Sequence, residues 1–442
     1  MADTIPEIIK DKISPKALET LAKVKHFVET ECIPADTIFH AQISADPAKR
    51  WATYPKIMEE LKTKAKAQGL WNLFLPSYYK ESAGYTNLEY ALMAEQMGRT
   101  FTGPETFNCA APDTGNMEVF ARYGNEEQKK QYLGPLMNGE IRSAFCMTER
   151  FVASSDARNI QLQITVDEKT DEYILNGRKW YASGAGDPRC KVWLVMGRVV
   201  DGEGKAASEN PYLQQSVVIV PAHHPGSKVI RAMGVYGYDD APHGHCEIDF
   251  TNCRIPRKNM VLGEGRGFEI IQGRLGPGRI HHCMRTLGAA EEGLRWMIWR
   301  VHDPSRRAFG KLLRDHETIV FNIAKSRMEI DGARLLVLAA AHLMDKEGPK
   351  AALSDIAKAK VVCPNVCLDV LDRAIQSFGA EGISQDTPLA YMWAGNRTLR
   401  LADGPDEVHT FQLGKTELKR YAKIKQEFDV TFEKIKPFKH HL

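Results

Sequence analysis

Residues 400–407, RLADGPDE, gather three carboxylates around a Gly-Pro turn near the end of the chain. A carboxylate held in a dry pocket can remove a proton from a weakly acidic carbon. Acidic turns also commonly cap helices or face solvent, and this segment by itself allows either role.

Polar residues also gather in the middle of the chain. Residues 145–149, FCMTE, and 153–156, ASSD, supply hydroxyls and loop amides where an extended, oxygen-rich ligand could bind. In residues 179–184, KWYASG, the flat ring of Trp180 stands near the hydroxyl of Ser183 and could flank a planar cofactor. An ordinary Ser/Thr loop and a core tryptophan are the structural alternatives.

Two segments of the last third suit a ligand that carries phosphate. Residues 306–311, RRAFGK, offer guanidinium groups, and residues 376–382, QSFGAEG, form a helix end whose glycines permit close backbone approach. A solvated basic turn and a helix cap are the alternatives.

Other chemistries find little support. Residues 263–268, GEGRGF, begin like a dinucleotide fingerprint, but they lie outside any βαβ unit and end in Phe268. The chain has no P-loop and no HExxH motif, and its nine cysteines lack CxxC spacing, so we expect no metal site and no disulfide framework. The rings of His281 and His282 point about 100° apart on a helix, and at least one is expected to have a packing or surface role.

Three regions must position these segments. Apolar residues recur every three or four positions before about residue 140, which predicts helices, and Gly124-Asn125 is typical of a helix start. Alternating apolar residues then predict an antiparallel β unit, in which Asn176-Gly177 favours a hairpin turn. Helical spacing returns after residue 258, in long runs of which one contains Pro364, predicted to kink or interrupt its helix.

Composition narrows the function classes. With 442 residues, of which 43% are hydrophobic, the chain can bury a large core. Its 59 Lys and Arg residues against 56 Asp and Glu residues are too balanced for a nucleic-acid-binding surface. No run of 18 apolar residues and no signal-peptide core is present, so we expect a soluble intracellular protein without a membrane span, in the cytoplasm, peroxisome or mitochondrion.

Taken together and in order, these segments closely resemble the acyl-CoA dehydrogenase superfamily from about residue 15 to 425. The matching elements are Met147-Thr148-Glu149, Ser155-Asp156, Trp180 with Ser183, Arg306-x-x-Phe309-Gly310, Gln376-x-x-Gly379 and Asp403-Gly404. VASSDARNI, WYASGAG, GRLGPGRIHHCMR and RLADGPDEVH are most similar to the branch that contains family members 10 and 11.

The resemblance implies an α+β fold that is mainly α. It comprises an N-terminal helical domain at residues 1–140, a middle antiparallel, barrel-like β domain at residues 141–257, and a C-terminal four-helix bundle domain at residues 258–442.

The resemblance also assigns roles to residues. It implies bound FAD, and Arg306, Gln376 and Gly379 match positions that reach the FAD of a neighbouring subunit, which implies a homo-oligomer, dimer or tetramer. Asp403 matches the catalytic carboxylate, and Arg279 lies in the helix that lines the acyl-CoA channel. The other matched positions are Phe145, Met147, Thr148, Ser155, Trp180, Ser183 and Glu407 for the cofactor, with Ser155 and Gly404 for the substrate.

The implied activity is that of an FAD-dependent acyl-CoA dehydrogenase in fatty acid metabolism. Asp403 would take the α-proton, the β-hydrogen would leave as hydride to flavin N5, and the product would be a trans-2-enoyl-CoA. Electron-transferring flavoprotein is the implied electron acceptor.

Departures from the family pattern keep other functions open. Asp403 replaces the usual Glu and shortens the reach by about 1.5 Å, which matters where ~1 Å of misplacement is costly. Nitroalkane oxidases of this superfamily use an Asp there, so a nitroalkane oxidase-like function is the alternative. A flavin-bearing binding protein without dehydrogenase activity is a third possibility. Arg150 and Ala380 replace a family proline and glycine.

Overall fold

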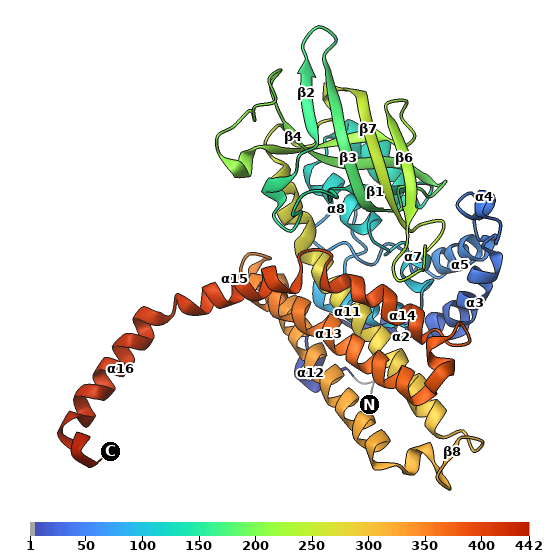
Figure 1. Ribbon diagram of the computed structural model, residues 1–442, viewed down its shortest axis with the longest axis vertical. Helices are drawn as coiled ribbons and strands as arrows, with labels where there is room; N and C mark the ends of the chain where they lie inside the picture. Colours follow the sequence, from blue (N-terminus) through green and yellow to red (C-terminus); the bar gives the residue numbers. More distant parts are fainter. Residues whose placement is uncertain (1–4, 442) are drawn as a thin grey trace.

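The chain passes through a helical, a β and a second helical region in that order (Figure 1). The structure is a computed structural model that describes residues 5–441, apart from the side chains of residues 275–277 and 439–441. The fold class predicted by the family resemblance is confirmed.

The first helices begin where local side chains can satisfy free backbone amides. Ser14 accepts a hydrogen bond from the Ala17 amide, and Thr86 forms a reciprocal capping box with Glu89. Asn125 forms another with Gln128, which confirms the predicted helix start there. The helices of this region are α1 (Glu7–Lys10), α2 (Pro15–Phe27), α3 (Ile33–Gln42), α4 (Pro47–Arg50), α5 (Lys56–Ala67), α6 (Asn87–Met97), α7 (Gly103–Thr106), α8 (Asp113–Tyr123), α9 (Glu126–Gln128) and α10 (Gly134–Asn138).

The middle region is a seven-stranded sheet of order β1-β4-β2-β3-β7-β6, with β5 paired to β4. Its strands are β1 (Arg142–Cys146), β2 (Gln163–Asp167), β3 (Glu172–Ser183), β4 (Cys190–Val199), β5 (Gln215–Pro221), β6 (Ser227–Met233) and β7 (His245–Pro256). β4 runs parallel to both β1 and β2, whereas the other pairs are antiparallel. The sheet is therefore mixed rather than antiparallel throughout, a difference that alternating apolar residues cannot reveal because they mark faces and not directions.

The hairpin turn predicted at Asn176-Gly177 is wrong. β3 continues through both residues, and its register against β7 shifts between Leu175 and Gly177. Gly177 has φ +145°, and the Asn176 side chain accepts a hydrogen bond from the Asn252 amide. The Asn-Gly pair thus forms a bulge in a long strand, while the β2–β3 turn lies at residues 168–171.

The last region packs three long helices, α11 (Gly267–Val301), α12 (Glu317–Glu347) and α13 (Leu353–Phe378). α13 is continuous through Pro364, so the interruption predicted at this residue does not occur. Short helices α14 (Leu389–Arg397), α15 (Asp406–Leu418) and α16 (Tyr421–Ile435) follow, and strands β8 (Arg307–Ala308) and β9 (Lys311–Leu312) form a hairpin between α11 and α12. α16 projects away from the rest of the protein (Figure 1).

The buried side chains form a core that extends from α2 and α6 through the bundle, and a second core within the sheet. All nine cysteines are buried and free. Within residues 5–441, no helix combines the length and apolar character that crossing a membrane requires.

Helices α6 and α11 touch through glycines. A Cβ added at Gly288 would lie 2.0 Å from the Glu95 carbonyl oxygen, and one added at Gly98 would lie 2.1 Å from that of Arg285. Because both neighbours are backbone atoms of helices, neither can yield without moving a helix. This contact sets the position of α11, which carries much of the candidate site.

We expect Gly288→Ala to lower the free energy of unfolding by about 1–3 kcal/mol, because the added methyl forces the two helices apart. Urea denaturation measures this loss. Gly332→Ala in α12 is the matched control, since a Cβ there meets no atom within 4 Å. The control should be neutral or gain up to about 1 kcal/mol from helix propensity. Equal losses in the two variants would contradict the close helix contact.

Candidate active site

The turn that carries Asp403 is held at both ends. Arg400 Nε donates to Asp406 Oδ2 at 2.7 Å, and Asn365 of α13 donates to the same oxygen at 3.1 Å. Asp403 and Gly404 have φ values of +56° and +97°, and a Cβ at Gly404 would lie 2.8 Å from His409 Nε2. A non-glycine residue in the left-handed region is uncommon and is maintained here by its surroundings.

Two side chains hold the backbone of Asp403 in that conformation. Arg279 Nε donates to its carbonyl oxygen at 3.1 Å, and His409 Nε2 donates to the same oxygen at 3.2 Å. Arg279 comes from α11 and His409 from α15, so two helices determine where the carboxylate begins.

The carboxylate of Asp403 lies in a cationic environment and is 19% exposed. His282 Nε2 is 3.3 Å from Oδ2. Burial alone would raise the pKa of Asp403, but His282, Arg274, Arg279 and Lys360 together hold it below its usual value. The group is therefore ionised at neutral pH, as a general base must be.

Arg274 links this turn to the end of strand β1. Its guanidinium lies 4.2 Å from the centre of the Phe145 ring and interacts electrostatically with Asp403. Its Nε is buried and has no hydrogen-bond partner among the described residues. The structure thus brings Phe145 and Asp403, more than 250 positions apart in sequence, to one place.

The loop after β1 is fastened by a buried ion pair. Lys179 Nζ donates to the Met147 carbonyl oxygen at 2.8 Å and to Glu149 Oε1 at 2.7 Å. Glu149 accepts further hydrogen bonds from the backbone amides of Gln161 and Leu162. The whole segment from β1 to β2 is therefore tied to β3.

The same ties bring the predicted cofactor residues Met147, Thr148 and Trp180 together. The Trp180 amide donates to the Thr148 carbonyl oxygen at 3.0 Å. β3 shifts its register between Lys179 and Ala182, and such a bulge re-aims the side chains beside it.

Polar groups on this surface fit the isoalloxazine end of FAD. Trp180 is half-buried, and its indole Nε1 has no hydrogen-bond partner among the described residues. Ser183 Oγ is 2.8 Å from His245 Nδ1, so its hydroxyl is already oriented. A half-buried ring with a free N–H group beside a hydroxyl suits a flat heterocycle with carbonyl acceptors.

Ser155, Arg150 and Glu407 lie further out. Ser155 is exposed in the loop before β2, and Arg150 is exposed with its guanidinium 5.2 Å from the Phe151 ring centre. Glu407 is exposed in the first turn of α15.

Arg306, Gln376 and Gly379 form a second set at the other end of α11. Arg306 lies 3.3 Å from Glu381, which follows the end of α13, and Gln376 accepts the capping hydrogen bond of Gly379 through its carbonyl. The β8–β9 hairpin beside Arg306 lies at the end of the helices remote from the sheet (Figure 1). α11 has 35 residues, a length of about 50 Å. One chain therefore does not bring the two sets of predicted FAD residues together.

His282, Arg274, Lys360 and His409 are site residues that the sequence reasoning missed. The signal for His282 was its spacing of three from Arg279, which places both side chains on one face of a helix. No local pattern indicates Lys360, because only tertiary packing brings α13 to the turn.

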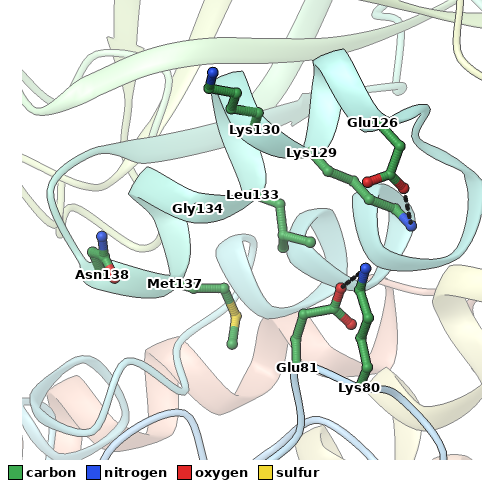
Figure 2. Close-up of a pocket in the computed structure, with 9 residues that line it drawn as sticks. All are labelled: Lys80, Glu81, Glu126, Lys129, Lys130, Leu133, Gly134, Met137 and Asn138. Atoms are coloured by element: carbon green, nitrogen blue, oxygen red, sulfur yellow. Dashed lines mark ion pairs between the residues drawn. The ribbon is translucent and has the colours of Figure 1, made fainter.

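Two pockets at the surface are not part of this site. Figure 2 shows one of about 340 Å³, in which Lys129 pairs with Glu126 at 3.5 Å and Lys80 with Glu81 at 3.9 Å. A second, of about 570 Å³, lies along strand β6. Neither is lined by Asp403 or by the residues around Trp180.

Comparison with known proteins covers all three regions. The acyl-CoA dehydrogenase N-terminal domain matches residues 14–140, the middle domain matches residues 144–253, and the C-terminal domain matches residues 265–418.

Similar proteins carry related names. "Probable acyl-CoA dehydrogenase IBR3" of Arabidopsis thaliana is 48% identical over 433 residues, and human "Acyl-CoA dehydrogenase family member 11" is 50% identical over 412. Each match covers 92% of this chain, which spans only 51% of either relative. "Probable acyl-CoA dehydrogenase FadE2" of Mycobacterium tuberculosis is 49% identical over 92% of this chain and 97% of its own length.

Solved structures agree with this assignment. A putative acyl-CoA dehydrogenase from Mycobacterium abscessus has a TM-score of 0.87 and 45% identity, over 92% of this chain and 99% of that one. Butyryl-CoA dehydrogenase from Megasphaera elsdenii has a TM-score of 0.74 and 25% identity, over 92% and 99%. The chain therefore belongs to the acyl-CoA dehydrogenase family, a family of FAD-dependent oxidoreductases.

Proposed function

We propose that the protein is an FAD-dependent acyl-CoA dehydrogenase that converts an acyl-CoA to a trans-2-enoyl-CoA, with Asp403 as the base. The observation that carries this proposal is the half-buried, ionised carboxylate of Asp403, held on a strained turn and linked through Arg274 to Phe145 near the end of β1.

The chemistry explains why such a carboxylate is needed. The α-proton of a thioester is weakly acidic, so its removal requires a base within hydrogen-bond reach and protected from water. Cations around Asp403 keep it ionised, and they also favour the negative charge that develops on the substrate as the proton leaves. Bound FAD would supply the acceptor for the β-hydrogen.

The chain's own residues would bind and orient the two ligands. Phe145, Met147, Thr148, Trp180 and Ser183 would hold the isoalloxazine end of FAD. Ser155 and Glu407 are proposed at its edge, Ser155 also toward the substrate. Arg279 and Gly404 would lie along the thioester, where Arg279 already holds the Asp403 carbonyl.

We also propose a homo-oligomer in which each FAD is completed by a second subunit. Arg306, Gln376 and Gly379 lie at the C-terminal end of α11, about 40 Å along the helix from Arg274, which contacts Phe145, so they would reach the adenosine-diphosphate half of a neighbour's FAD. Phe309 beside Arg306 is 99% exposed, and α16 has no buried residue. A second copy of the chain would cover such apolar surface.

Two inactive variants should complement each other if sites are shared. Arg306→Glu removes the residue that acts on the neighbour, and Asp403→Asn removes the base of the variant's own site. A hybrid dimer of the two retains one site with both groups intact. Co-expression in equal amounts should restore about a quarter of the parental sites by random pairing. No gain over either variant alone, with hybrid formation verified by two affinity tags, would contradict the shared site.

A nitroalkane oxidase-like reaction is not favoured, because the matched relatives are named acyl-CoA dehydrogenases. The experiment that separates the two is anaerobic titration of the FAD-loaded protein with acyl-CoAs of increasing chain length and with nitroethane, while the flavin absorbance is recorded. We expect an acyl-CoA to bleach it. Bleaching by nitroethane alone would overturn the dehydrogenase proposal. Re-oxidation by electron-transferring flavoprotein, compared with oxygen, identifies the electron acceptor.

A further inference from the structure

We infer that His282 is a positioning residue whose Nε2–H group faces Oδ2 of Asp403, so that Oδ1 is the oxygen that receives the α-proton. This inference rests on the proposed role of Asp403 and names the groups that orient it. The strained turn determines the backbone position of Asp403. It does not determine the side-chain torsions, so a further contact is needed to orient the carboxylate.

The hydrogen bonding of His282 determines which nitrogen carries the proton. Arg285 Nη2 lies 3.2 Å from His282 Nδ1. Since a guanidinium group only donates hydrogen bonds, Nδ1 must be the acceptor and its proton must be on Nε2. Nε2 is the nitrogen that lies 3.3 Å from Asp403 Oδ2.

His282 is neutral in this arrangement. Burial and the neighbouring Arg285 lower the pKa of His282 to about 3. The contact with Asp403 is thus between an uncharged N–H donor and a carboxylate. At 3.3 Å the two atoms are close, but the N–H group is not aligned for a hydrogen bond, as is common for catalytic groups before the substrate binds.

The arrangement excludes His282 as the final proton acceptor. One ring nitrogen already carries a proton, and the other accepts from Arg285. Among the described residues, His282 Nε2 is the group placed within 3.3 Å of the carboxylate, and it occupies the Oδ2 side. The abstracted proton therefore stays on Asp403, at Oδ1, until the product leaves.

Other titratable groups lie around the same carboxylate on each element packed against it. Arg274 and Arg279 come from α11, Lys360 from α13 and His409 from α15. Lys360 also donates to the Leu399 carbonyl, and Arg279 and His409 donate to the Asp403 carbonyl. These groups hold the backbone or act at longer range, and among the side chains that the structure describes only His282 contacts the carboxylate itself. Loss of His282 should therefore change the orientation and titration of Asp403 while the surrounding cations stay in place.

Three variants of the FAD-loaded protein test this role. His282→Gln keeps an N–H donor near the position of Nε2, whereas His282→Leu removes it. His281→Leu is the matched control, since His281 is a buried imidazole one residue away whose nitrogens have no hydrogen-bond partner among the described residues. The readouts are exchange of the acyl-CoA C2 hydrogen with D₂O and the pH dependence of anaerobic flavin reduction.

We expect His282→Leu to slow C2 exchange about 10- to 100-fold, because the carboxylate is no longer oriented. Without the donor the pKa of Asp403 rises, so the rate should begin to fall at a higher pH as the solution is acidified. His282→Gln should recover most of the rate. In this variant the pH at which the rate falls on acidification, the acid limb of the pH–rate profile, should return toward that of the parent. His281→Leu should leave the acid limb unchanged. Equal loss in His282→Gln and His282→Leu, with no movement of the acid limb, would reduce His282 to a packing residue.

A measurement on the protein without substrate separates this inference from the proposed reaction. In protein labelled with ¹⁵N-histidine, the His282 signal is identified by its absence in His282→Gln. Its shifts should show a neutral ring protonated at Nε2. Protonation at Nδ1 would overturn the arrangement, whatever the substrate proves to be. If no acyl-CoA exchanges its C2 hydrogen in the parent protein, the proposed function is wrong. The ¹⁵N spectrum still decides separately whether the proton of His282 is on Nε2.

Discussion

Asp403→Asn is expected to retain FAD and to lose flavin reduction by acyl-CoA about 100- to 10,000-fold or more. The amide keeps the shape of the carboxylate but cannot accept the α-proton. Because Arg279 and His409 hold the backbone carbonyl of residue 403 rather than its side chain, the turn should keep its conformation. Stopped-flow mixing under anaerobic conditions measures the reduction rate.

The control removes a carboxylate of equal size from a position outside the site. Asp386 is exposed in the loop before α14, and Asp386→Asn should reduce its flavin at the parental rate. FAD content, read from the visible spectrum, must match in all three proteins. Undiminished reduction in Asp403→Asn would show that another group is the base.

Lys179→Met should be the most destabilising of the substitutions considered. The Lys179 side chain is fully buried, burial lowers its pKa, and the opposing attraction of Glu149 favours its charged form. Removal of one partner leaves Glu149 as an unpaired buried charge, which costs about 3–5 kcal/mol. The free energy of unfolding by urea should fall by this amount. FAD should also dissociate more readily, because the Met147 carbonyl loses its anchor.

Two further proteins test the cause of this loss. Lys191→Met removes an exposed lysine from strand β4 of the same sheet and should stay within about 0.5 kcal/mol of the parent. Lys179→Met combined with Glu149→Gln removes the unpaired charge and should recover part of the stability. A double variant no more stable than Lys179→Met would contradict the unpaired-charge explanation.

The order of the regions could be predicted because period-3.6 and period-2 apolar patterns are local properties of the sequence. The direction of the strands and the conformation of Asn176-Gly177 could not be predicted. A residue pair that favours hairpin turns also suits a bulge, and the pairing of β3 with β7 over a long register decides between them.

The candidate site shows the same division. Ordered motifs that resemble a family predict site roles for Asp403, Trp180 and the Arg306 turn, and these roles stay predictions. The cationic surroundings of Asp403 could not, because α11, α13 and α15 reach the turn only through tertiary packing, such as the glycine contact of α6 with α11. His282 was visible in the sequence as half of a histidine pair, but its role depends on Arg285 one turn further along the helix.

We propose that the protein removes hydrogen from C2 and C3 of an acyl-CoA, with Asp403 as the acceptor of the C2 proton. The most direct measurement is an anaerobic single turnover of acyl-CoAs deuterated separately at C2 and at C3. We expect each label to slow flavin bleaching, each to be lost from the product, and one enoyl-CoA to form per reduced flavin. An oxidised flavin that no acyl-CoA bleaches, or bleaching without enoyl-CoA, would contradict the account.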